Sequence, residues 1–204
     1  MLVYFVRHAE SEANVRKIVS SQDVGIHPLT ERGREQAYDL AMQLEGKDFT
    51  VAYSSDLLRA VQTTEIILRD RAIPFHTTPL LREHDSGAWE GRSDDEVWEQ
   101  MHQLFQEWIG GELEAQPQGG ESLRDMQRRF TGFLETIFDQ HSGTSRPILI
   151  VSHAGLYWAN LPFLFNNIEF NFMRERGLDN ASLIIGEYSD GEWRCINWCG
   201  EPLD

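Results

Sequence analysis

A chain of 204 residues is long enough for one well-buried core and short for two, so we expect a single domain over residues 1–204. The formal net charge is −15, and Lys17 and Lys47 are the only lysines; such a field repels polyphosphate, which argues against a nucleic-acid or anionic-membrane partner. The apolar opening at residues 1–6 is short and has no basic region before it. It predicts neither a signal peptide nor a membrane span, and we expect a cytoplasmic protein.

Short apolar runs alternate with segments of helical period along the chain. Runs that are apolar throughout indicate strands buried on both faces, which favours an α/β fold. We expect a three-layer αβα sandwich around a mostly parallel sheet, with the last two strands forming an antiparallel edge. The candidate strands are residues 2–6, 50–53, 74–78, 148–152, 182–188 and 193–198.

Two helices are predicted from capping residues that follow the first and second strands. Thr30 and Asp56 have short side chains that can accept hydrogen bonds from free backbone amides, and each precedes apolar residues at helical spacing. Each is therefore the expected N-cap of a helix that packs on the sheet.

Two further helices are predicted with no strand between them. Ser93 with Glu96, and Ser122 with Asp125, resemble capping boxes before amphipathic stripes. With the glycine-rich turn that joins them, these helices are expected to form a small helical lobe, at about residues 92–140, over the active site at one end of the sheet.

Polar residues with catalytic potential follow several of the predicted strands. Ligands bind outside the carboxyl ends of parallel strands, so a functional residue should follow a strand. Arg7 and His8 follow the first strand, Arg59 lies in the first turn of the helix after the second, Glu83 follows the third, and His153 follows the strand at 148–152. We expect all of them to share one rim.

That rim would combine two arginines, two imidazoles, a carboxylate and a helix N-terminus, and its natural ligand is a phosphate. A neutral imidazole is a good nucleophile toward phosphorus, and flanking arginines would keep His8 uncharged and neutralise the phosphoryl oxygens. Glu83 is the candidate general acid that protonates the leaving oxygen and later the base that activates water. The sequence thus predicts a phosphoryl-transfer enzyme with a histidine nucleophile.

The order of these residues resembles the histidine phosphatase superfamily, whose members include the cofactor-dependent phosphoglycerate mutases. Ala9 departs from the pattern, because the family usually has glycine there, and it leaves the backbone course of that loop open. The matching segments are RHAESEAN at 7–14, LTERG at 29–33, SSDLLRA at 54–60, Glu83 within 81–91, GGES at 119–122 and VSHAG at 151–155.

The resemblance implies that His8 becomes phosphorylated and that Arg7, Arg59 and His153 bind the phosphoryl oxygens, with Glu83 as the proton donor. It implies no metal and no cofactor. The further substrate-binding residues that the family motifs imply are Ser11, Asn14, Ser20, Ser21, Ala154 and Gly155.

The residues after Glu83 favour the phosphatase branch of that family. Mutases carry Arg-His-Tyr-Gly there, whereas this chain has His-Asp-Ser-Gly at 84–87, and Arg92 is the only arginine or lysine between Gly91 and Arg124. A small, highly anionic substrate would find few cationic partners. We therefore expect an acid-type phosphomonoester hydrolase; a phosphoglycerate mutase and a non-enzymatic phosphate-recognising module are the alternatives.

Other chemistries have weaker support. No pair among the remaining histidines has the helical spacing of a metalloprotease motif, and Cys195 is followed six residues later by Glu201 rather than the arginine of cysteine phosphatases. Trp98, Phe105 and Trp108 are interpreted as helix packing, with the lobe adding one apolar wall to the site. The expected partner is a small-molecule phosphomonoester. Sugar phosphates, phosphoglycerate, nucleotide-precursor phosphates and phosphoproteins stay open as substrates, as does the oligomeric state.

Overall fold

A computed structural model of the chain describes residues 1–169, 172 and 176–203. Within these residues, seven strands form one sheet in the order β3-β2-β4-β1-β5-β6-β7. The strands are β1 Leu2–Arg7, β2 Val51–Ser55, β3 Phe75–Thr78, β4 Ile148–Ser152, β5 Leu183–Ser189, β6 Glu192–Trp198 and β7 Glu201–Pro202.

The sheet is parallel on one side of β1 and antiparallel on the other. Strands β3, β2, β4 and β1 pair in parallel, while β5 runs antiparallel to β1, β6 to β5 and β7 to β6. The mostly parallel core and the antiparallel edge predicted from the sequence are therefore confirmed. The two-residue strand β7 was not predicted, because so short a segment has no periodicity to detect.

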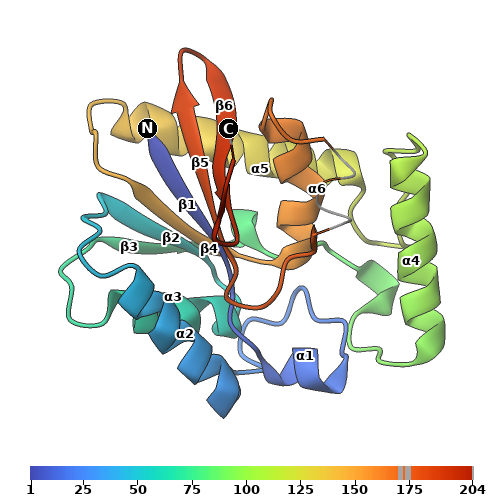
Figure 1. Cartoon of the computed structure of the whole chain (residues 1–204). Coiled ribbons are helices and arrows are strands. Elements are labelled where there is room, and N and C mark those ends of the chain that lie inside the picture. The colour runs from blue at the N-terminus through green and yellow to red at the C-terminus, as the bar shows by residue number, and fades with distance from the viewer. Residues whose placement is uncertain (170–171, 173–175, 204) are drawn as a thin grey trace.

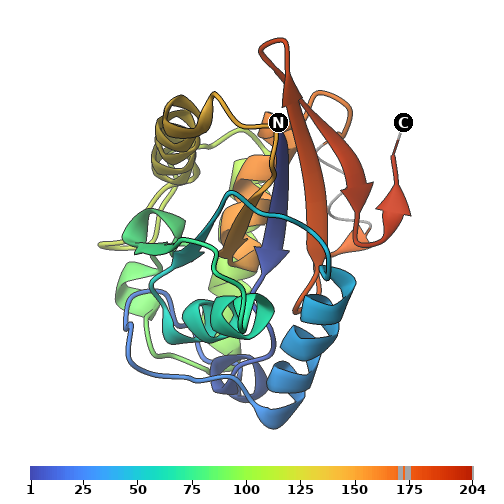
Figure 2. The same ribbon diagram turned by 90° about the vertical axis from the view of Figure 1, so that its left-hand side faces the viewer.

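Helices cover both faces of the sheet and give the expected three layers (Figures 1 and 2). Helices α2 and α3 lie on one face, and α5 and α6 lie on the other. The α-helices are α1 Glu12–Arg16, α2 Glu31–Gln43, α3 Leu58–Leu68, α4 Asp95–Ile109, α5 Leu123–His141 and α6 Ala154–Leu164, with short 3₁₀ helices η1 Pro79–Leu81 and η2 Gly87–Trp89.

Alternate residues of β1 supply two separate cores. Tyr4 and Val6 belong to the core under α2 and α3, whereas Val3 and Phe5 belong to the core under α5 and α6, where Phe5 meets the ring of Phe130. Each such buried side chain contributes about 1.5–3 kcal/mol of transfer free energy. A strand that is apolar throughout is thus explained by burial on both faces.

The lobe predicted at about 92–140 divides into two parts. Helix α4 stands to one side of the sheet, beyond α6 (Figure 1), and its side chains line the cavity at the carboxyl ends of the strands, as expected of the lobe. Helix α5, by contrast, buries Met126, Phe130, Phe133, Leu134 and Ile137 and packs with α6 against the sheet. Since its 19 residues carry a continuous apolar stripe, α5 belongs to the sandwich layer, and only α4 with its flanking loops covers the site.

Two of the predicted helix starts are confirmed. The Thr30 hydroxyl accepts a hydrogen bond from the amide of Gly33 at 3.0 Å. Ser122 and Asp125 exchange side-chain to backbone hydrogen bonds of 3.1 and 3.2 Å, which is the predicted capping box. Each arrangement satisfies backbone donors that the first turn of a helix leaves free.

The other two predicted caps are wrong. Asp56 accepts two hydrogen bonds from Arg82, at 2.7 and 2.6 Å, and Leu57 is the N-cap residue of α3 without a side-chain bond. A bidentate ion pair competes well with a single amide for this carboxylate. Helix α4 is capped by Asp94, which accepts from Val97, rather than by Ser93. Aspartate adds a favourable charge at the positive end of the helix.

Helix α6 was not predicted from the sequence. Its residues are almost all apolar, so they have no polar face and no helical period. The helix buries Leu156, Tyr157 and Leu161 in the core between the sheet and α5, while Phe163 is exposed. Its position directly after β4 places its N-terminus at the site.

Gly33 allows α2 to begin against the loop that follows β1. A Cβ at Gly33 would lie 2.0 Å from the carbonyl oxygen of Glu10. We predict that Gly33→Ala lowers the free energy of unfolding in urea by about 1–3 kcal/mol, because backbone has to move. Gly132→Ala is the matched control, since Gly132 is helical and its Cβ would meet nothing within 4 Å. It should stabilise the protein by about 0.5–1 kcal/mol. Equal effects of the two changes would contradict the prediction.

Candidate active site

The pairing of β1 with β4 brings two histidines together. The strands are parallel, with Arg7 opposite Ser152, so the residues that follow, His8 and His153, leave the sheet side by side. The amide of His8 donates to the Ser152 carbonyl at 2.9 Å, and the two imidazole centroids are 5.0 Å apart. The expected convergence of strand ends is therefore present.

A cavity of about 240 Å³ opens at this point and is lined from several elements. Four of the predicted catalytic residues line it, namely Arg7, His8, Arg59 and Glu83. His153 is fully buried next to His8 and does not belong to the cavity lining. The structure thus brings all five predicted residues to one place, with His153 behind the wall.

The His8 ring is held in a defined tautomer. Its Nδ1 lies 2.7 Å from the carbonyl oxygen of Ala9, and a carbonyl can only accept, so Nδ1 carries the proton. The other nitrogen, Nε2, accepts a hydrogen bond of 3.1 Å from Nε of Arg59. Its lone pair therefore points to the arginine side of the site, which is the orientation that nucleophilic attack requires.

Both histidines are kept neutral. Burial lowers the pKa of His8 well below its ordinary value, and the positive charges of Arg59 and Arg7 lower it further. Burial likewise lowers the pKa of His153, with Arg59 as the next cause. From the sequence we expected the arginines to keep His8 neutral, whereas desolvation by burial is the larger cause of its lowered pKa.

Arg59 and Arg7 supply the positive charge. Arg59 reaches back from the first turn of α3, and besides His8 it donates to the hydroxyl and the carbonyl of Ser20, at 3.3 and 2.7 Å. Burial lowers its pKa to about 10, so it stays charged at neutral pH. Arg7 donates through Nη1 to the carbonyl of Leu178.

Three buried nitrogen atoms at the site have no hydrogen-bond partner among the described residues. They are Nε of Arg7 and both ring nitrogens of His153. A buried donor without a partner costs about 1–3 kcal/mol, so it is unfavourable unless something binds it. Donors on a positive wall are the groups that an anion satisfies.

Glu83 occupies the N-terminus of α6. Its carboxylate accepts hydrogen bonds from the amides of Gly155 and Leu156, at 3.0 and 2.9 Å, and from the amide of His84 at 2.9 Å. A Cβ at Gly155 would lie 2.3 Å from Oε1 of Glu83. The N-terminus of α6 therefore holds the carboxylate of Glu83, and glycine at 155 makes that approach possible.

The other predicted substrate-binding residues fall into two groups. Ser11 is fully buried, and it caps α1 with bonds of 3.0 Å from its amide and hydroxyl to Oδ1 of Asn14 instead of lining the cavity. The remaining predicted residues line the cavity: Asn14, Ser20, Ser21, Ala154 and Gly155.

Ala9 causes no strain where glycine was the expected residue. It has no positive φ, its amide donates to the Thr63 hydroxyl at 3.1 Å, and its methyl group packs with Leu29 and Ala37. The loop after β1 therefore follows a course that an alanine adopts freely.

Glu90 was not singled out from the sequence, yet it shapes the cavity. Its carboxylate accepts from the amides of Ser21 and Gln22, at 2.9 and 3.1 Å, and from the Ser21 hydroxyl at 2.7 Å. It thereby holds the loop that supplies the partners of Arg59. The only local signal was its place in the segment 81–91 that carries Glu83.

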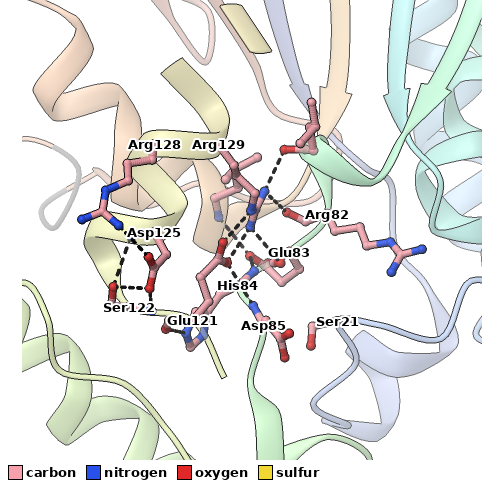
Figure 3. A network of polar contacts seen from close by, with 12 residues as sticks. Ser21, Arg82, Glu83, His84, Asp85, Glu121, Ser122, Asp125, Arg128 and Arg129 are labelled. Atoms are coloured by element: carbon pink, nitrogen blue, oxygen red, sulfur yellow. Dashed lines mark hydrogen bonds and ion pairs between the residues drawn. The ribbon is translucent and has the colours of Figure 1, made fainter. Parts of the chain in front are cut away.

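Arg129 fixes the chain segment that carries Glu83 (Figure 3). It donates to the carbonyls of Leu80, Arg82 and Glu83, at 2.8, 3.0 and 3.2 Å, and forms an ion pair of 2.7 Å with Glu121. The Glu121 carbonyl in turn lies 2.7 Å from Nε2 of His84. Helix α5 therefore holds the backbone on both sides of Glu83.

Helix α4 forms an apolar wall of the cavity through Trp98, Met101 and Phe105. Trp108 is buried beneath and packs edge-on against His84. The interpretation of the aromatic stripe as packing therefore holds for Trp108, while Trp98 and Phe105 face the cavity.

A family model described as "Histidine phosphatase superfamily (branch 1)" matches residues 3–200. The chain belongs to the histidine phosphatase superfamily. Members of this superfamily are phosphatases or mutases, and the described fold agrees with its solved structures.

Three relatives of this superfamily member illustrate both activities. It is 32% identical over 157 residues to "Adenosylcobalamin/alpha-ribazole phosphatase" of Escherichia coli, covering 76% of this chain and 75% of that protein. It is 31% identical to "Probable phosphoglycerate mutase GpmB" of Yersinia pestis, covering 96% and 89%. The crystal structure of the alpha-ribazole phosphatase from Shigella flexneri superposes with a TM-score of 0.81 at 26% identity, covering 100% and 98%.

The described residues contain neither a metal-binding cluster nor a helix that could span a membrane. Over residues 1–169, 172 and 176–203, no cluster of three or more His, Cys, Asp or Glu side chains is placed to bind a metal ion. None of the helices in that part of the chain is long and apolar enough to cross a membrane.

We predict that Arg129→Met lowers the free energy of unfolding by about 2–4 kcal/mol, because three carbonyls and the half-buried Glu121 lose their partner. Urea unfolding followed by circular dichroism measures it. Arg128→Met is the matched control, since Arg128 precedes it on α5 and its side chain is 67% exposed. The control should change stability by less than about 0.5 kcal/mol. A loss no larger than that of the control would contradict the described network.

The neutral histidines predict a dependence of stability on acid pH. His8 stays neutral in the folded protein, while in the unfolded chain it gains a proton near pH 6.5, so the free energy of unfolding falls as pH drops below that value. Each such histidine contributes up to about 1.4 kcal/mol per pH unit. Between pH 6.5 and 5.5, His8→Gln should lose about 1 kcal/mol less stability than the parent. His76→Gln, at an exposed histidine of β3, should behave as the parent does. Parallel curves for all three proteins would refute a neutral His8.

Proposed function

We propose that the protein is a phosphomonoester hydrolase that works through a phosphohistidine on His8. The observation that carries the proposal is the state of the His8 ring: it is neutral, its Nδ1 proton is fixed on the Ala9 carbonyl, and its Nε2 lone pair lies on the side of Arg59. An imidazole in this state is the active form of a nucleophile toward phosphorus.

In the first step the phosphoryl oxygens of the substrate accept hydrogen bonds from the guanidinium of Arg59 and from the unpartnered Nε of Arg7. Arg59 then no longer donates to His8, and Nε2 of His8 is free. Nε2 then attacks phosphorus, and the bond from phosphorus to the leaving oxygen breaks. The arginines balance the charge that shifts onto the phosphoryl oxygens. We assign a further hydrogen bond to the same group to His153, whose ring centroid lies 5.0 Å from that of His8 and whose two ring nitrogens have no partner among the described residues.

Glu83 moves the protons. In the resting site its carboxylate accepts three amide hydrogen bonds, so the proton for the leaving oxygen enters with the monoanionic phosphomonoester and passes through Glu83. In the second step water attacks the phosphohistidine, Glu83 takes a proton from it, and the bond between phosphorus and Nε2 breaks. Glu83 then passes this proton to the departing inorganic phosphate, which leaves as the monoanion, and the site returns to its initial state.

The charges around the cavity favour hydrolysis over a mutase reaction. Arg7 and Arg59 are the only arginines or lysines of the described cavity lining, and both are assigned to the phosphoryl group. Arg92, the one basic residue that α4 and its flanking loops could offer, is tied to Asp94 at 2.6 Å. The carboxylate of a phosphoglycerate would have no cation there, which supports the activity of the alpha-ribazole phosphatase relative over that of the mutase relative.

His8→Ala should lower kcat for p-nitrophenyl phosphate and phenyl phosphate at least about 10³-fold, measured as product release in buffer with chelator. His76→Ala, an exposed histidine of β3, is the matched control and should stay within about twofold of the parent. Acid-labile phosphate should be trapped on the parent by rapid quench and not on His8→Ala. An active His8→Ala protein would rule out the mechanism.

Glu83→Gln should slow the reaction of phenyl phosphate more than that of p-nitrophenyl phosphate. Phenoxide needs a proton as it leaves, whereas p-nitrophenoxide does not, so kcat for phenyl phosphate should fall about 10²–10⁴-fold and the phosphorylation step with p-nitrophenyl phosphate much less. Rapid-quench kinetics measure that step. Equal losses on both substrates would contradict Glu83 as the general acid.

The two alternatives give other results in the same assays. A phosphoglycerate mutase would interconvert 2- and 3-phosphoglycerate faster than it releases inorganic phosphate. A phosphate-recognising module would bind phosphorylated ligands without turnover and without phosphate on His8.

A further inference from the structure

A second cavity adjoins the one that contains His8. Its volume is about 390 Å³, and it lies between α4, α6 and the segment at 177–178. Phe105, Ala154 and Gly155 line both cavities, so the two adjoin each other at these residues. We call the second cavity the outer chamber; its other apolar wall residues are Ile109, Trp158 and Leu178.

The outer chamber differs in chemistry from the inner cavity. No Arg, Lys, Asp or Glu belongs to its described lining, and its polar side chains are those of His102 and Gln106, both exposed. The inner cavity, by contrast, holds two arginines and a carboxylate. An anionic group has no partner in the outer chamber, whereas an apolar group would be removed from water on several sides.

The boundary between the two cavities is formed by two small residues and one aromatic ring. Ala154 and Gly155 begin α6, and a Cβ at Gly155 would lie 2.3 Å from Oε1 of Glu83. Phe105, which also lines both cavities, packs against Trp158 at a centroid distance of 5.1 Å. The contact that positions Glu83 thus also keeps a larger side chain away from this boundary.

We propose that the outer chamber binds the distal part of the leaving group, and that the preferred substrates are phosphomonoesters of bulky alcohols or phenols with an extended apolar ring system. The proposal rests on the proposed hydrolase activity. The inner cavity then holds the phosphoryl group and the atoms next to it, and the outer chamber holds rings that a small sugar or glycerate ester does not have.

The test uses three phosphate esters whose parent phenols have nearly the same acidity: phenyl, 2-naphthyl and biphenyl-4-yl phosphate. Differences in kcat/KM then report binding of the extra ring rather than leaving-group chemistry. For the parent, kcat/KM should rise about tenfold or more from the phenyl to the biphenyl-4-yl ester, since a second ring is buried.

Ile109→Asn places an amide in the outer chamber and should reduce that ratio to less than about threefold. Leu178→Asn, on the segment after α6, should do the same and serves as an independent variant if either protein folds poorly. Met42→Asn makes the same kind of change on the exposed surface of α2, where Met42 is 59% exposed, and should keep the parent ratio.

A parent ratio near one, or a ratio unchanged in both chamber variants, would overturn the proposal. In that case hydrolysis of phenyl phosphate by the parent would leave the proposed function standing. Failure of the parent to hydrolyse any of the three esters would overturn both.

Discussion

The parallel pairing of β1 with β4 is the constraint on which the site depends. With Arg7 opposite Ser152, the two strands end at the same level, and the residues after them are the two histidines. Both strands are buried on each face, so a shift of register by one residue would move each apolar side chain into the opposite core, where other side chains are already packed. The stability of the sandwich therefore also fixes the relation between His8 and His153.

Around these strand ends, contacts between distant segments set the chemistry. Arg59 comes from α3, Glu83 from the segment after β3, and the amides that hold Glu83 from α6. Arg129 on α5 and Glu90 after η2 then hold the two loops that complete the cavity. Most of these supporting bonds join side chains to backbone, and the supporting charges also reach the site: Glu90 raises the pKa of Arg59, and Arg129 lowers that of His153.

The sheet, its parallel core and the five central residues could be predicted from the sequence, because buried strands leave apolar runs and functional residues follow them. Helix α6 could not be predicted, since its almost wholly apolar sequence has no helical period. The cap at Asp56 was wrong because local patterns do not contain Arg82, which lies 26 residues away and binds its carboxylate. The cap at Ser93 was wrong by one residue, because the neighbouring Asp94 adds a negative charge at the helix N-terminus. The contact of Glu83 with the amides of α6 could not be predicted either, as it joins distant parts of the chain.

The hydrogen bond from Arg59 to Nε2 of His8 also limits which molecules His8 can react with before a substrate binds. While it is in place, the only lone pair of the ring is engaged, and Ser20 keeps the guanidinium where it is. A reactive electrophile that brings no negative oxygens cannot draw Arg59 away and meets a shielded nitrogen. A phosphate ester carries negative oxygens that can accept the hydrogen bonds of Arg59 and so free Nε2 of His8. The phosphoryl group that His8 attacks is thus also the group that frees its Nε2 from Arg59. The resting hydrogen bond therefore favours phosphate esters over other electrophiles.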